Sequence, residues 1–216
     1  MTLTGSTYLP RYVSQKSAFS GYAADITAVL DVLKLAATPL AADGMTTGEG
    51  LVDWITENQI QVSFGATEEN ELGYHLPEYG EDSEGEKWIS GQITISTSIQ
   101  SNKYVCASVL AHEILHAVWW LDDYGPWWWL HTKEEMEYGT PPDGTSRAYN
   151  SIDQEYNAFV TGRQVWEGFI AQAIDVGTGE NPGYGYDIEM EHYSGSESEA
   201  KEYIRMLYAE QELTEY

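Results

Sequence analysis

The sequence predicts a single α+β domain over residues 1–216, in which a small mixed sheet lies beside several helices. Two patterns support this class. Apolar residues recur at helical spacing in several segments, and two shorter segments between them alternate apolar with polar residues, as half-buried strands do. A chain of 216 residues can bury one sizeable core, and no segment has the composition of a linker that would divide it.

The first half of the chain is predicted to hold two helices and two strands. Residues 18–37 form an amphipathic helix that ends before a proline, and residues 47–59 form a shorter helix. Strands follow over residues 59–65 and 88–99, each with isoleucine, valine or phenylalanine at alternate positions. The acidic, glycine-containing segment 68–86 between them indicates a hairpin or a solvated loop, since the ordered ligand spacing of an EF-hand is absent.

A helix predicted over residues 102–121 carries the pattern HExxH. His112 and His116 stand four residues apart, so both imidazoles project from one face of the helix and can reach a single metal ion. Glu113 lies beside His112, where its carboxylate can take a proton from a metal-bound water. The opposite side of the helix is apolar, so we expect the motif face to line a cleft while the other face packs into the core.

The stretch 109–118 resembles the extended signature of the zincins, the HExxH zinc metallopeptidases. Val109 stands three residues before the first histidine, where the signature has Val or Thr, and the residues around the motif are uncharged. The resemblance covers this helix, the strand before it and a later helix. It implies a zincin-like domain that binds Zn²⁺ through His112 and His116 and uses Glu113 as the catalytic base. It also implies that strand 88–99 lies at the sheet edge and pairs with an extended substrate; an interior strand is the alternative.

Zinc needs a third protein ligand if water is to take the fourth position, and three residues compete for this role. Asp122 stands at the metzincin position, but Trp119 replaces the glycine that bends the chain there. Glu135 fits the spacing of many gluzincins, although it lies in a polar segment that looks solvated. Glu155 is the preferred candidate.

Glu155 is preferred because of the helix predicted around it. Residues 151–154 have the S-x-x-Q form of a capping box, which predicts a helix over about residues 151–173. Glu155 falls within the apolar stripe of that helix, and a carboxylate on such a face is costly unless a cation compensates its charge. Ala158 and Gly162 would allow a close approach to the first helix.

The second helix also resembles the E-x-x-A third-ligand helix of minimal gluzincins, through Glu155 and Ala158. It departs from the thermolysin type, because Phe159 replaces the aspartate that orients a ligand histidine. We therefore expect an orienting carboxylate from elsewhere in the chain. The candidates are Asp122, Asp123 and Asp153.

The end of the chain and its tryptophans complete the pattern. Residues 194–208 predict a last helix. Tryptophans crowd between the two zinc helices, where we expect most to pack the core and Trp120, on the histidine side, to be the best candidate for a substrate pocket. This group consists of Trp119, Trp120, Trp127, Trp128 and Trp129.

Composition excludes several classes of partner. The net charge is −25, with 10 Lys and Arg against 35 Asp and Glu, which argues against nucleic acid and against an anionic membrane surface. Cys106 is the single cysteine, so the chain forms no internal disulfide and no thiolate zinc site. Neither a signal peptide nor a segment of transmembrane length is evident, which favours the cytoplasm, with a virion or leaderless export as alternatives.

The expected function is zinc-dependent hydrolysis of a peptide bond in a peptide or protein substrate. The alternative is a catalytically inactive zinc-containing binding or structural module, associated with a phage or a toxin system; a non-peptide amidohydrolase is a further one. Peptide hydrolysis needs a donor for the oxyanion, and the sequence leaves four candidates open. They are Tyr156, Tyr184, Tyr186 and His192.

Overall fold

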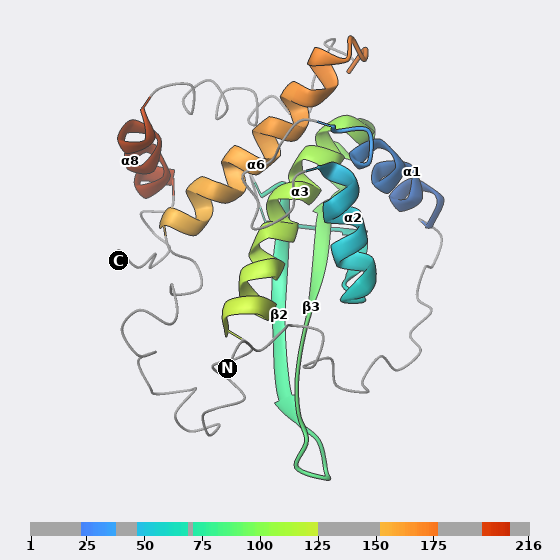
Figure 1. Cartoon of the computed structure of the whole chain (residues 1–216), viewed down its shortest axis with the longest axis vertical. Helices are drawn as coiled ribbons and strands as arrows, with labels where there is room; N and C mark the ends of the chain where they lie inside the picture. The colour runs from blue at the N-terminus through green and yellow to red at the C-terminus, as the bar shows by residue number, and fades with distance from the viewer. Residues whose placement is uncertain (1–22, 38–46, 69–70, 125–151, 177–195, 208–216) are drawn as a thin grey trace.

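The computed structural model describes residues 23–37, 47–68, 71–124, 152–176 and 196–207 (Figure 1). Within these ranges the chain is a mixture of helices and a small sheet, in agreement with the predicted α+β class. Some predictions concern residues outside these ranges, namely Glu135, Trp127, Trp128, Trp129, Tyr184, Tyr186 and His192. The elements in chain order are α1 (Ala23–Leu33), α2 (Gly48–Glu57), β1 (Gln61–Gly65), β2 (Gly73–Glu81), β3 (Lys87–Ser96), the 3₁₀ turn η2 (Thr97–Ile99), α3 (Lys103–Trp119), the π-helical turn η3 (Trp120–Tyr124), α6 (Ile152–Ala171) and α8 (Glu197–Leu207).

The sheet has three strands in the order β1-β3-β2. β1 runs parallel to β3, with Val62 opposite Ile93, and β2 runs antiparallel to it, with His75 opposite the same residue. β3 is therefore the central strand. The prediction that residues 92–98 form an edge with free backbone groups is wrong, because Gln92–Ser96 is paired on both sides within the sheet.

The second edge of the described sheet is β2, which lies in the acidic segment predicted as a hairpin or a loop. β2 and β3 form a long hairpin that extends beyond the helices in Figure 1. Its turn is closed by Asp82, whose backbone N–H donates to the Glu86 carbonyl and whose Oδ1 accepts from the N–H groups of Glu84 and Glu86. Pro77 lies within β2, a position compatible with an edge strand because proline has no N–H to donate to a second neighbour.

One face of the sheet carries the core. In β3, buried Ile89, Gly91, Ile93 and Ile95 alternate with half-buried residues, as predicted for a strand with one buried face. α3 packs against β2 and β3 on this side, and Figure 1 shows α2 and α3 in front of the two strands. Helices thus cover one face of the sheet, and α3, which carries the HExxH pattern, directly contacts the β2–β3 hairpin.

α3 is buried on every side, unlike the helix expected from the sequence. All residues from Val105 to Trp119 are buried, so the predicted division into a cleft face and a core face is wrong. α6 covers the histidine side of α3, and α1 also packs against α3. The span Lys103–Asp122 is long and apolar enough to cross a membrane by length and composition, contrary to the expectation that no segment is, but 89% of its most apolar window is buried inside the protein.

The N-terminal helices meet at Gly48. The Thr47 side chain caps α2 by accepting from the Gly50 N–H, and the Gly48 N–H donates to the Ala36 carbonyl just beyond α1. A Cβ on Gly48 would lie 1.9 Å from the Leu33 carbonyl oxygen, which is a backbone atom and cannot rotate away. Glycine is therefore required where α2 begins against the end of α1.

We expect Gly48→Ala to lower the free energy of unfolding by about 2 kcal/mol or more, as overpacking against a fixed group does. Denaturant titration followed by circular dichroism measures this change. Gly65→Ala is the control, since its new Cβ would meet the Thr94 methyl at 2.8 Å, a side-chain end that can move. Equal losses in the two variants would contradict the role of the Leu33 carbonyl.

Candidate metal centre

α3 is held at its start by Asn102. The side-chain oxygen of Asn102 accepts from the N–H groups of Tyr104 and Val105, and its amide donates to the Val176 carbonyl at 3.1 Å. This single residue both caps α3 and ties it to the segment that follows α6. The position of the HExxH turns is thus defined by contacts made about three to four helical turns earlier.

α6 approaches α3 closely in the middle of both helices. Ser108 Oγ donates to the Gly162 carbonyl, and Ala158 is fully buried, so small residues allow the two helices to come together as expected. The Phe159 ring packs edge-on against the His112 ring, with centroids 4.5 Å apart. The crossing brings the first turn of α6, with Glu155, over the two histidines.

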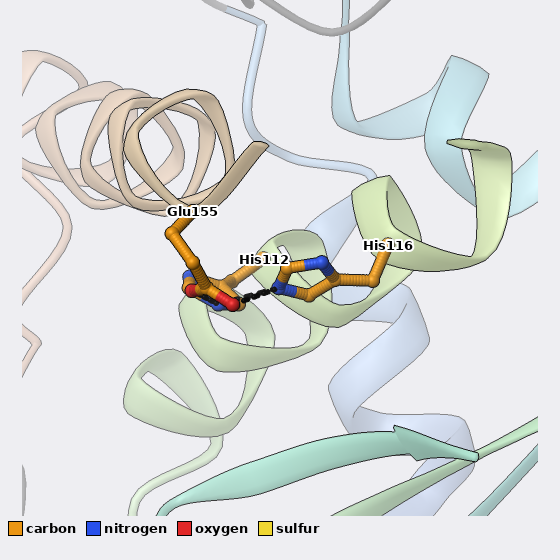
Figure 2. Close-up of side chains that lie close together, drawn as sticks. All are labelled: His112, His116 and Glu155. Carbon is orange, nitrogen blue, oxygen red and sulfur yellow. Dashed lines mark hydrogen bonds and ion pairs between the residues drawn. The ribbon is translucent and has the colours of Figure 1, made fainter. Parts of the chain in front are cut away.

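Three predicted ligands lie together between α3 and α6 (Figure 2). The Nε2 atoms of His112 and His116 are 3.1 Å apart. Glu155 Oε2 lies 3.5 Å from Nε2 of His112, and Oε1 lies 3.4 Å from Nε2 of His116. All three side chains are buried, and their donor atoms are close enough to bind one metal ion.

The charges of this group compensate one another. Burial alone would raise the pKa of Glu155, but the charge of His116 and the hydrogen bonds from both histidines outweigh it and lower the pKa. Burial would lower the pKa of His116, and the neighbouring Glu155 carboxylate raises it instead. A carboxylate and imidazoles in this arrangement form a site that favours a cation.

Glu113 lies beside the ligand group but faces the sheet. Its side chain is 5% exposed, and burial raises the pKa of its carboxyl against the opposing effect of the two histidines. A Cβ placed on Gly73, the first residue of β2, would lie 3.2 Å from Glu113 Oε1 and 2.8 Å from a Val109 methyl. The absence of a side chain at Gly73 therefore allows the edge strand to pass next to the Glu113 carboxylate.

His75 occupies the same side of the hairpin. It is buried on β2, and burial, followed by the charge of His116, lowers its pKa to about 3. A Cβ on Gly91 would lie 2.2 Å from His75 Nε2, so the ring fits where β3 has no side chain. His75 does not belong to the group of possible metal ligands in the described part of the chain.

Other predicted site residues lie apart from the ligand group. Asp122 is exposed in η3 and is not in the group, and Asp153 forms an ion pair with Lys201 at 2.6 Å. The indole N–H of buried Trp120 donates to the Ser90 carbonyl at 2.8 Å, and its ring packs against Tyr79, so this tryptophan fastens the hairpin to α3. Tyr156 is half-buried in α6, with the Lys201 ammonium above its ring.

Neither ligand histidine has an orienting partner within the described ranges. Nδ1 of His112 and Nδ1 of His116 are buried there without a hydrogen-bond acceptor. The expected carboxylate from Asp122 or Asp153 does not occupy this place, and the side chain of Asp123 lies outside the description. Sequence reasoning also missed Gly73 and Lys201, since a glycine in a turn-like segment and a lysine in a surface helix carry no local signal.

Comparisons with known proteins give no match: no family model matches the chain, and neither a curated protein nor a solved structure does. The interpretation of the site therefore depends on its own geometry and chemistry.

We expect Glu155→Ala to lower metal occupancy strongly, because it removes the carboxylate that completes the ligand group. Asp122→Ala and Glu135→Ala should leave the metal content unchanged. Zinc stoichiometry after dialysis, measured by atomic absorption on the folded variants, tests this expectation. Unchanged metal content in Glu155→Ala, together with a loss in Glu135→Ala, would transfer the third ligand to segment 132–137.

Proposed function

We propose that the protein is a zinc-dependent metallopeptidase of the zincin type. The observation that carries this proposal is a buried group of possible metal ligands, His112, His116 and Glu155, beside a second buried carboxylate. This carboxylate belongs to Glu113, the residue that follows His112 on α3. The ligand group supplies a place for the metal. Glu113 supplies a base that none of the three ligands can supply while it holds the metal.

Zinc fits the donor set and its spacing. Two imidazole nitrogens and a carboxylate oxygen are the ligands of many catalytic zinc sites. Zinc–ligand bonds of about 2.0–2.1 Å at tetrahedral angles place neighbouring donor atoms about 3.3 Å apart. The two imidazole nitrogens are 3.1 Å apart, and each lies near a different oxygen of Glu155, at 3.5 Å for His112 and 3.4 Å for His116, so the spacing is close to that value. Three protein ligands leave one position for water, as catalysis requires.

The reaction then assigns a role to each residue. His112, His116 and Glu155 hold the metal, which when bound acts as a Lewis acid toward the scissile carbonyl and acidifies water. The Glu113 carboxylate accepts the proton of the attacking water as its oxygen bonds to the carbonyl carbon. Glu113 then delivers that proton to the amide nitrogen as the C–N bond breaks. Burial raises the pKa of the Glu113 carboxyl against the opposing charges of His112 and His116.

The outer edge of β2, a terminal strand of the described sheet, is the proposed place for the substrate backbone. β2 begins next to Glu113, and its outer edge has no partner strand among the described elements. An extended peptide added to this edge would run past the base at Gly73. This proposal transfers strand addition from residues 92–98, which are paired, to Gly73–Glu81.

A second candidate function is a metal-stabilised module without turnover. The observation that favours it is the burial of every ligand, with His112, His116 and Glu155 each no more than 7% exposed. A metal bound between two buried helices would contribute folding free energy directly. The two candidates differ in what Glu113 is needed for.

Glu113→Gln separates the two candidates. The substitution keeps the size of the side chain and removes the base, so we expect unchanged zinc content and thermal stability with at least about a 100-fold loss in peptide cleavage. His116→Ala, the matched control in the ligand group, should lose both zinc and stability. The measurement is cleavage of a diverse peptide pool at matched zinc occupancy. If the zinc-loaded wild-type protein cleaves no peptide in the pool, the peptidase proposal is rejected in favour of a metal-stabilised module without turnover.

We also expect a peptide-like inhibitor with a zinc-binding group to protect amides of Gly73–Glu81 from hydrogen exchange. The reason is that strand addition pairs backbone N–H groups at the outer edge of β2 with the inhibitor backbone. Hydrogen exchange with mass spectrometry on the zinc-loaded protein reads this out, and Gln61–Gly65, at the opposite edge of the sheet, provides the internal control. Protection confined to β1 would mean that the substrate pairs with the other edge.

A further inference from the structure

We propose that α8 braces the ligand-bearing end of α6 and that Lys201 is a positioning residue for Glu155. The inference rests on the metal centre of the proposed function and does not depend on the reaction carried out there. In Figure 1, α8 lies beside the N-terminal end of α6, on the side away from α3.

Lys201 joins the two helices through three contacts. Its ammonium lies 2.6 Å from Asp153 Oδ1 of α6 and 2.5 Å from Glu197 Oε1 of α8. It also lies 5.3 Å from the centroid of the Tyr156 ring. Asp153 lies two residues before Glu155, and Tyr156 lies one residue after it. Lys201 therefore contacts the same helical turn that carries Glu155.

The brace and the metal site occupy different faces of that turn. At about 100° per residue, Glu155 is turned by about 100° from Tyr156 and by about 200° from Asp153. Lys201 therefore contacts α6 on one side while Glu155 points from the other side toward α3. Ala200 and Ile204 of α8 are buried next to Lys201 in sequence, which anchors the brace by apolar contact as well.

The first turn of a helix is where such support has the largest effect. Its N–H groups have no intrahelical partner, so this end frays more easily than the middle. Glu155 lies in the first turn of α6, whereas His112 lies within α3 and His116 lies in its last turn, which continues into η3. A ligand that is already ordered loses less conformational freedom when the metal binds, and affinity rises accordingly.

Charge adds a second reason. Lys201 places one positive charge between two carboxylates, those of Asp153 and Glu197, which both contact its ammonium group. Without it these two groups would face each other across the helix interface and repel, in a chain with 35 acidic and 10 basic residues. Repulsion at this point would separate α8 from the turn that holds Glu155.

The test is zinc affinity of the full-length protein, measured by competition with a chromophoric chelator. We expect Lys201→Met to weaken zinc binding about fivefold, below the 10- to 100-fold typical of groups bonded directly to a ligand, because the brace acts through the helix. Asp153→Asn, which leaves α8 intact, should have a similar effect, and the double variant should lose no more than either single one. Co²⁺-loaded protein should show an altered visible spectrum in the same variants.

Arg205→Met is the matched control. It removes one positive charge from the same helix, and the Arg205 guanidinium pairs with Glu202 of α8 itself, 3.1 Å away. Its zinc affinity should equal that of wild type. Equal affinity in Lys201→Met and wild type, or an equal loss in Arg205→Met, overturns the brace. Zinc binding that responds as described, without cleavage of any peptide, overturns the peptidase proposal and leaves the brace in place.

Discussion

The contact of Glu155 with His112 and His116 is the interaction on which the arrangement of the helices depends. A buried carboxylate without a counter-charge costs several kcal/mol, so α6 can cover α3 only where imidazoles or a cation meet that charge. The distances of 3.4 and 3.5 Å require the helices to approach closely. Ala158 and the Ser108–Gly162 hydrogen bond permit this approach. The small residues at the crossing therefore allow the contacts that Glu155 makes at the end of α6.

Burial of α3 on all sides divides its polar face between two neighbours. α6 covers the ligand group, while β2 passes next to Glu113 at Gly73. Glu113 and the possible metal ligands are thus covered by different elements, one a helix and the other the edge strand β2 of the described sheet. Under the proposed function, a strand-like substrate added at β2 would reach Glu113 without displacing α6. The hydrogen bond from the Trp120 indole N–H to the Ser90 carbonyl holds the hairpin against the end of α3.

The helices and the possible metal ligands could be predicted because they depend on local sequence. The order of the strands could not, because it depends on pairing between distant segments. HExxH at helical spacing and a carboxylate on an apolar stripe pointed to His112, His116 and Glu155 without knowledge of the fold. β2 was left open because glycine and Pro77 disfavour an interior strand but are tolerated at an edge. Whether β3 lies inside or outside the sheet depends on partners that its own alternation cannot specify. The cleft face of α3 was mispredicted for the same reason, since the helix that covers it follows later in the chain.

The position of Glu113 weighs against a purely structural metal site. A structural zinc site is closed by four protein ligands, whereas the group in the described part of the chain, His112, His116 and Glu155, offers three. Glu113 adds a second carboxylate to the same buried region, where burial raises its pKa against the opposing charges of His112 and His116. Such an arrangement costs stability that an apolar residue at position 113 would not cost. Costly buried groups of this kind concentrate at functional sites, which supports the proposal that Glu113 acts as a proton acceptor.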